Sequence, residues 1–227
     1  MSAVGVHGVR WSTGYVAAGA LSLVLCGCVP WTVRPIENGE SAESSGHATL
    51  VPSRYVDSIW DSKLVPTVLN SAVDARTLLD SMSSSVEQAR NRYGHRDASG
   101  PWYFMVKGEG RVISIDTRSR VGLAFVDVAP FDRQADLSLQ IGPVLRGTSL
   151  RDAPGIVHFT DFVNQLQFAD VANELNDRAL KLVLAPIESA KLKGRLVSFA
   201  GAARAEDGAQ PPIRELVPVR LAVEDGR

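Results

Sequence analysis

Apolar positions recur along this chain with two different periods, and the change of period divides its later part in two. Between residues 53 and 94 they recur every three to five positions, beginning with Tyr55, Ile59 and Trp60, which is the spacing of one helix face. From residue 101 onward, apolar and polar positions alternate, as in a strand with one buried face. The pattern therefore predicts helices first and a sheet afterwards.

Short helices are expected in the first of these parts. Asp74 is a suitable N-cap for one of them. Ser84 and Glu87 have the spacing of a capping box before another, and Gly94 supplies a stop after it. Residues 53–94 are therefore predicted to form an N-terminal helical lobe.

Five strands are predicted in the second part. The first, at 102–117, is long and contains Gly108-Glu109-Gly110, which indicates a bulge or a sharp bend. The other strands are expected at 121–128, 136–145, 194–204 and 214–224.

One long helix, at 164–184, is expected between the third and fourth strands, with an apolar stripe that includes Leu166, Val171, Leu175 and Leu182. The order of three strands, a helix and two strands, beginning with a long bent strand, is the connectivity of an OB-fold. We therefore predict an α+β chain with an OB-fold-like five-stranded β-barrel and an N-terminal helical lobe. A generic open α+β sheet with helices on one face is the alternative.

The start of the chain has the pattern of an export signal. Residues 1–13 contain one firm positive charge, Arg10, and residues 13–25 contain no charge. The apolar run ends in Leu25-Cys26-Gly27-Cys28, which resembles a bacterial lipobox. Cys28 is thus predicted to become the N-terminus and to carry fatty acyl chains such as palmitate. An uncleaved signal anchor with two inert thiols is the alternative.

The next residues, up to about position 52, are rich in Ser, Gly, Glu and Pro and contain few large apolar side chains. Such a composition is typical of a flexible tether. The predicted organisation is a lipoprotein signal peptide at 1–27, a tether at 28–52, the helical lobe at 53–94 and the barrel domain at 95–227.

Composition adds limits on the function. No cysteine follows Cys28, so the folded part has no disulfide framework and depends on its hydrophobic core. The net charge is −1, or −2 without Arg10, which gives no electrostatic reason to expect nucleic-acid binding. We expect attachment to a membrane through the N-terminal lipid.

Four blocks of sequence, in order, resemble the DUF2291 family of predicted periplasmic lipoproteins. They are YVDSIWDSKLVPTVLNSAVDARTLL, VKGEGRVISIDTRSRVGLAFVDV, LQIGPVLRGTSLRDA and DFVNQLQFADVANELNDRA, within residues 53–204. The resemblance implies a lipid-anchored protein of the cell envelope, on the periplasmic side or the cell surface. Because family members commonly sit beside sugar ABC-transporter genes, it also implies a link to solute uptake. It implies no reaction and no catalytic residues.

Patterns that carry catalysis or cofactor binding are weak in this chain. The histidines are scattered, at His7, His47, His95 and His158, without the spacing of a metal site. There is no Gly-x-Ser-x-Gly motif, and the glycines at 108 and 110 lack the third glycine of a dinucleotide-binding loop. We therefore expect no cofactor, no metal and no enzymatic activity, with an uncharacterised hydrolase as the weaker alternative.

One stretch, RGTSLRDA at 146–153, gathers charged and hydroxyl side chains after the third strand. Such paired donors and acceptors suit sugar hydroxyls, and OB-folds bind ligands near this part of the barrel. The candidate ligand or partner contacts are Arg146, Thr148, Ser149, Arg151, Asp152, Asn164 and Gln165. The alternative is structural: Arg151 pairs with Asp152, and Asn164 caps the long helix.

Two non-enzymatic functions fit these expectations. The first, which we favour, is an accessory lipoprotein of a solute uptake system that binds a sugar-like small molecule or an ABC-transporter component. The second is a structural envelope lipoprotein that binds a membrane protein partner.

Overall fold

The computed structural model describes residues 51–97, 99–205 and 213–224. The predicted signal peptide, the lipidation site at Cys28 and the tether up to residue 50 lie outside these residues. All structural statements below concern the described part of the chain.

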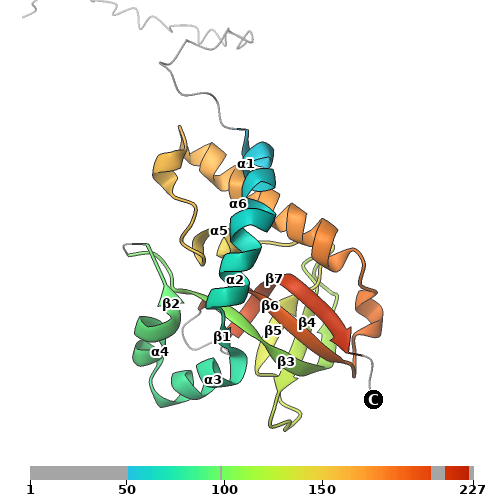
Figure 1. Cartoon of the computed structure of the whole chain (residues 1–227). Coiled ribbons are helices and arrows are strands. Elements are labelled where there is room, and N and C mark those ends of the chain that lie inside the picture. Colours follow the sequence, from blue (N-terminus) through green and yellow to red (C-terminus); the bar gives the residue numbers. More distant parts are fainter. Residues whose placement is uncertain (1–50, 98, 206–212, 225–227) are drawn as a thin grey trace, which may run out of the picture. The chain divides into compact units, whose positions relative to one another are not determined.

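Five strands close a barrel (Figure 1). They are β3 (Tyr103–Asp116), β4 (Leu123–Val128), β5 (Leu137–Gln140), β6 (Leu196–Ala205) and β7 (Ile213–Glu224). Their order around the barrel is β3-β4-β5-β7-β6, and β6 pairs with β3 to close it. Only β5 and β7 pair in parallel; the other neighbours in the barrel are antiparallel. The predicted OB-fold-like five-stranded barrel and α+β class are confirmed.

The long strand β3 changes partner at the predicted bend. Residues 103–111 pair with β6, and residues 110–116 pair with β4. A Cβ atom on Gly110 would lie 2.7 Å from the carbonyl oxygen of Asp127 in β4, closer than real side chains approach. Glycine at this position therefore lets the backbones of β3 and β4 come together where the pairing changes.

The N-terminal helices are α1 (Pro52–Ile59), α2 (Val65–Ser71), α3 (Ala75–Ser84) and α4 (Val86–Tyr93), with a π-helical turn, Trp60–Leu64, between the first two. Asp74 caps α3 as predicted, because its carboxylate accepts the Thr77 backbone N–H at 3.1 Å. Ser85, rather than Ser84, caps α4. Two short strands, β1 (Val73–Asp74) and β2 (Gly94–His95), pair with β3 and join these helices to the barrel.

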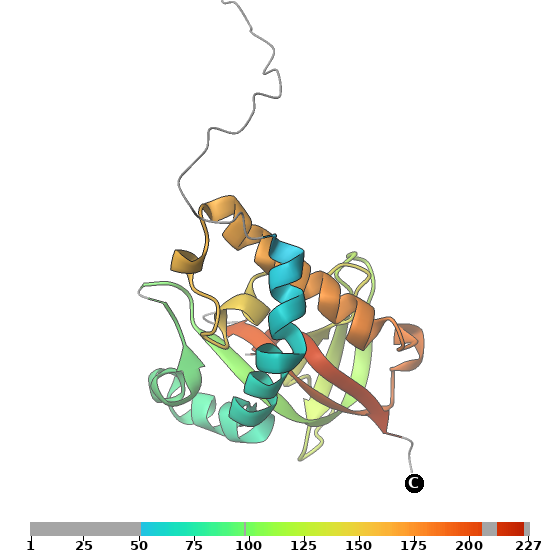
Figure 2. The ribbon, with the colours of Figure 1, turned by 45° about the horizontal axis from the view of Figure 1, so that its top comes forward.

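The helices and the barrel share one continuous hydrophobic core. The long helix α6 (Gln165–Ala179) lies between β5 and β6 in the sequence, and α1 crosses it in both views (Figures 1 and 2). The ring of Tyr55 in α1 also meets the ring of Phe162, just before α6, edge-on, with 5.3 Å between the ring centroids. The α2 and α3 helices pack on β3, and α2 also contacts β6.

The long helix covers most of the predicted range but buries only part of the predicted stripe. A π-helical turn at Leu180–Leu184 continues α6. Val171 and Leu175 are buried as expected, but Leu166 and Leu182 are 70% and 52% exposed. Leu166 lies in the first turn of α6, and Leu182 lies within the π-helical turn, where the wider winding changes the direction of the side chains.

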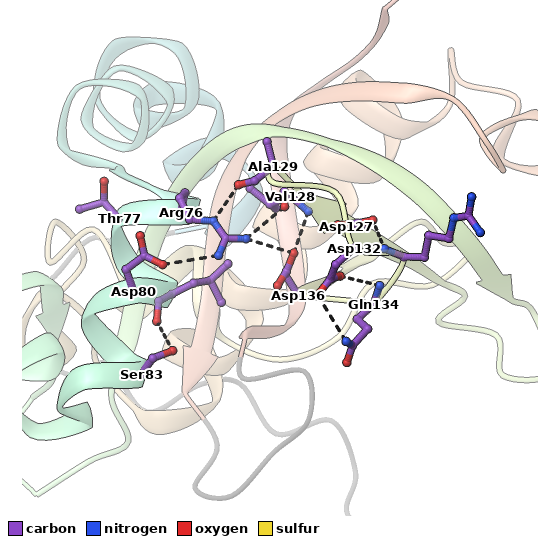
Figure 3. Close-up of polar contacts among 12 residues, drawn as sticks. Arg76, Thr77, Asp80, Ser83, Asp127, Val128, Ala129, Asp132, Gln134 and Asp136 are labelled. Atoms are coloured by element: carbon purple, nitrogen blue, oxygen red, sulfur yellow. Dashed lines mark hydrogen bonds and ion pairs between the residues drawn. The ribbon is translucent and has the colours of Figure 1, made fainter.

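Arg76 in α3 ties that helix to the loop after β4 (Figure 3). Its Nε donates to the Ala129 carbonyl at 2.8 Å, and its Nη2 donates to the Val128 carbonyl at 3.0 Å. The same nitrogen lies 3.4 Å from the Asp136 carboxylate, which also accepts the Val128 backbone N–H. Arg76 thus links α3 to the backbone at the end of β4.

Candidate functional site

A polar pocket of about 330 Å³ opens where the ends of several barrel strands meet. It receives side chains from the start of β3, the end of β5, the end of β6 and the start of β7, together with the loop that leads into α5 (Ser149–Asp152). The residues that line it are Tyr103, Gln140, Arg146, Gly147, Thr148, Ser149, Arg204, Arg214 and Glu215.

Two buried amide side chains hold the loop of this pocket in place. Gln140 accepts the backbone N–H of Arg146 at 2.8 Å and donates to the carbonyls of Arg146 and Glu215 at 3.0 and 3.1 Å. Asn176 of α6 donates to the Gly147 carbonyl at 2.9 Å. The loop is therefore fixed against β5, β7 and α6, and its hydroxyl groups are preorganised.

The backbone at the start of β7 is also held in an unusual conformation. Glu215 has a φ of +54°, in the left-handed region that a residue with a Cβ rarely adopts. Its N–H donates to the buried Ser138 hydroxyl at 3.0 Å, and its carbonyl accepts from Gln140. These bonds hold the conformation, from which the Glu215 carboxylate pairs with Arg146.

Hydroxyl groups also line the pocket. The Tyr103 hydroxyl and the Thr148 hydroxyl are 3.0 Å apart, and the nearly buried Ser149 lies beside them. Burial raises the pKa of Tyr103 above its ordinary value of 10, while its hydrogen bond with Thr148 opposes that shift. The Tyr103 hydroxyl is therefore protonated at neutral pH, and it interacts with the Asp152 carboxylate as well as with the Thr148 hydroxyl.

Arg204 and Arg214 provide the charge of the pocket. They stand directly opposite each other on β6 and β7, and Tyr103 stands directly opposite Arg204 on β3. Neither guanidinium group forms a hydrogen bond or an ion pair with a described residue. By contrast, Arg146 pairs with Glu215 through two nitrogens, one of them at 2.9 Å.

The structure places the predicted contacts in three different settings. Arg146, Thr148 and Ser149 line the pocket. Asn164 caps α6 by accepting the Gln167 backbone N–H at 2.9 Å, and Gln165 is exposed in the first turn of that helix. These two residues are not among the residues lining the pocket.

Arg151 and Asp152 form a nearly buried pair beside α6. Arg151 donates to both oxygens of the Asp152 carboxylate, at 2.7 and 3.1 Å. Its third nitrogen donates to the Phe168 carbonyl at 3.0 Å, and its guanidinium carbon lies 3.7 Å from the centre of the Phe168 ring. Neither side chain lines the pocket, and the donors of Arg151 are engaged within the protein.

Sequence reasoning missed Tyr103, Gln140, Arg204, Arg214 and Glu215. One signal for the arginines is visible in the sequence, because Arg204 and Arg214 flank the segment that joins the last two predicted strands. Residues on either side of such a connection face each other when the strands pair. Nothing comparable indicates Tyr103, which reaches the pocket by pairing with a strand far along the chain.

Two other hollows lie on the described surface. A groove of about 650 Å³ runs between α3 and the barrel, where Arg76 and Lys107 donate to backbone carbonyls. A pocket of about 470 Å³ shares Arg204 with the polar pocket and contains Arg96 stacked on Trp102, 4.5 Å from the ring centre.

The sequence profile of a family described as "Predicted periplasmic lipoprotein (DUF2291)" matches residues 18–222, most of the chain. The chain belongs to the DUF2291 family. This confirms the resemblance seen in the sequence, and the description of the family supports an extracytoplasmic location in the cell envelope. No curated protein matches the chain.

The DUF2291 chain is also similar to a solved structure, an OB-fold protein from Thermotoga maritima. The TM-score is 0.64 and the sequence identity is 21%, over 78% of this chain and 100% of that one. At this identity the likeness shows the fold alone, and it agrees with the barrel described above.

The described residues contain neither a membrane-spanning helix nor a cluster of metal-ligating side chains. Between residue 51 and residue 224, apart from the undescribed gaps, no helix has both the length and the apolar character that crossing a bilayer requires. The same residues contain no group of three His, Cys, Asp or Glu side chains placed to hold a metal ion.

Proposed function

We propose that this lipoprotein is a non-enzymatic binding component of a solute uptake system, anchored through lipid on Cys28. Its polar pocket binds a sugar-like small molecule. The observation that carries the proposal is the gathering of hydroxyl, amide and guanidinium groups from β3, β5, β6, β7 and one loop around a single cavity of about 330 Å³.

The chemistry of the pocket suits binding better than proton transfer. Sugar hydroxyls need both donors and acceptors, which Tyr103, Thr148 and Ser149 supply on a loop fixed by Gln140. The carboxylate that lines the pocket, Glu215, is engaged by Arg146. The volume falls within the range of small-molecule sites in proteins, roughly 300–1,000 Å³.

The context of the family supports the uptake role. Family resemblance implies a link to sugar ABC transporters, and a lipid anchor keeps a binding protein close to a transporter embedded in the same membrane. Restricting the two partners to one surface raises their effective concentration without any new contact.

A thermal-shift screen tests the proposal on the full chain in detergent. At a hundredfold excess over Kd, a bound monosaccharide stabilises the folded protein by about 2.7 kcal/mol, which corresponds to a rise in Tm of roughly 5–10 °C. The variant Thr148→Val, which removes a hydroxyl of the pocket, is expected to lose most of this shift. Ser198→Ala is the matched control, because it removes a hydroxyl of β6 that pairs with Glu224 outside the pocket.

The proposal fails if no member of a broad panel of neutral and acidic sugars raises Tm. It also fails if Thr148→Val responds to the ligand as the unchanged protein does while both proteins unfold cooperatively.

A second function, binding to a membrane protein partner, is favoured by one surface feature. Phe159, Val163 and Leu166 are all exposed and lie within eight residues of sequence at the start of α6. Large apolar side chains grouped in this way commonly mark protein contacts. Under this function, Leu166→Ser is expected to reduce co-purification of a membrane protein at least tenfold, measured by affinity capture from solubilised membranes.

Leu182→Ser is the control for this experiment, because Leu182 is also exposed on a helical turn but lies outside the group. Equal recovery of partners with both variants would rule out this surface as the contact.

A further inference from the structure

We infer that the polar pocket selects an acidic ligand, a hydroxylated small molecule that carries a carboxylate or a phosphate. The inference rests on the proposed binding function and adds the charge of the ligand. The feature that carries it is the arginine pair, defined as Arg204 and Arg214.

The register of the barrel places the two arginines where they repel each other. Side chains directly opposite in an antiparallel pair point to the same face, with Cβ atoms about 4.5–5.5 Å apart, and like charges at such positions are unfavourable. Arg204 and Arg214 occupy such positions on β6 and β7, and both line the pocket.

The described residues do not compensate this repulsion. Neither guanidinium group of the arginine pair is hydrogen-bonded or ion-paired within the described chain, and the Nε of Arg214 is buried without a hydrogen-bond partner there. The pocket is lined by three arginines and one carboxylate, Glu215, which pairs with Arg146. Among the described residues that line the pocket, two positive charges therefore have no carboxylate to pair with, and a ligand could neutralise them.

An acidic group fits these donors. The planar guanidinium group presents parallel N–H donors that match the two oxygens of a carboxylate or phosphate, and such charge-assisted bonds are among the strongest hydrogen bonds in proteins. Next to the arginine pair, Tyr103, Thr148 and Ser149 offer hydroxyl groups to the rest of the ligand. Sugar acids and sugar phosphates combine both kinds of group.

The surface beside the pocket adds to the attraction. Arg204 also lines the neighbouring pocket of about 470 Å³, where Arg96 lies over the Trp102 ring. A surface that carries several charges of one sign raises the local concentration of a ligand of the opposite sign.

The test compares charged and neutral forms of the same sugar, and a sugar phosphate with the bare anion, on the full chain in detergent. Isothermal titration calorimetry is carried out with D-glucuronate against D-glucose, D-galacturonate against D-galactose, and D-glucose 6-phosphate against inorganic phosphate. At least one acidic sugar is expected to bind ten or more times more tightly than its neutral partner. Its affinity is expected to fall as salt is raised, because screening weakens the attraction between partly exposed charges.

Substitutions distinguish the contribution of the arginine pair to binding from the effect of the net charge of the protein. Arg214→Gln is expected to weaken binding of the acidic sugar at least tenfold, and Arg214→Lys is expected to be intermediate because it keeps the charge but loses the paired donors. Arg220→Gln is the matched control, since it removes an arginine from the same strand outside the pocket, and it is expected to change the affinity by less than twofold.

The Tm of the ligand-free protein shows whether a loss of binding is caused by misfolding. Since Arg214→Gln removes a repulsive neighbour of Arg204, its Tm without ligand is expected to equal or exceed that of the unchanged chain. A loss of binding together with an unchanged or higher Tm supports the inference.

Four results would overturn it. If neutral sugars bind as tightly as acidic ones, the binding function stands and the charge preference is wrong. If Arg220→Gln weakens binding as much as Arg214→Gln, net charge and not the arginine pair is responsible. If inorganic phosphate binds as tightly as D-glucose 6-phosphate, the pocket recognises a bare anion and the ligand class is wrong; binding of no compound at all removes the proposed function as well.

Discussion

Replacing Arg151 with alanine is expected to lower the free energy of unfolding by about 3–5 kcal/mol, the usual cost of removing one partner of a buried ion pair. The side chains of Arg151 and Asp152 are only 11% and 15% exposed, and Arg151 engages both oxygens of the Asp152 carboxylate. The substitution leaves that carboxylate nearly buried without its partner. It also removes a donor to the Phe168 carbonyl and a cation stacked on the Phe168 ring.

Urea unfolding of the full chain in detergent measures this change, and Arg146→Ala is its matched control. Both substitutions remove an arginine that pairs with a carboxylate, and the two positions are five residues apart. The Arg146 side chain is 60% exposed, so losing its pair with Glu215 is expected to cost less than about 1 kcal/mol. If Arg151→Ala costs no more than Arg146→Ala, the Arg151–Asp152 pair is not a structural element.

Replacing Cys28 with serine is expected to move the whole population of the protein out of the membrane fraction. Serine has no thiol to receive the lipid, and each buried CH₂ group of an acyl chain contributes about 0.8 kcal/mol to membrane binding. If Cys28 carries two or three acyl chains, as proposed, these chains account for nearly all of the attachment. Cell fractionation followed by intact-mass measurement checks this expectation.

Cys26→Ser is the control for this experiment, because it removes the other cysteine of the segment and leaves Cys28 in place. It is expected to leave the membrane fraction unchanged. Retention of Cys28→Ser in the membrane, or a mature protein with the mass of its amino acids alone, would show that the anchor lies elsewhere.

The fold could be predicted because local patterns carry it. Alternation across 102–117, the glycines at its centre and the long amphipathic helix determine the order of elements, and that order matches few topologies. The third strand, however, was expected to reach residue 145 and ends at Gln140. Gly142 has a φ of +73° and Pro143 has no N–H, so neither continues the ladder, although the apolar pattern extends past them.

The pocket was only partly predictable, for a different reason. Arg146, Thr148 and Ser149 come from one loop, so composition alone indicates them. Tyr103 and Arg204 belong to strands that are far apart in the sequence and meet only through their pairing register. Alternation shows which face a residue occupies but not which residue stands opposite, because register depends on packing of the whole barrel.

The pairing of β6 with β3 affects how readily neighbouring lipid-anchored molecules would aggregate. Lipoproteins held on one surface meet each other far more often than molecules free in three dimensions. A sheet with a long open edge would offer its unpaired N–H and C=O groups to every neighbour, and adjacent molecules would join strand to strand into aggregates. Because the ring of strands is complete, that route to aggregation is largely blocked, and we expect the lipid-anchored protein to tolerate a high surface density.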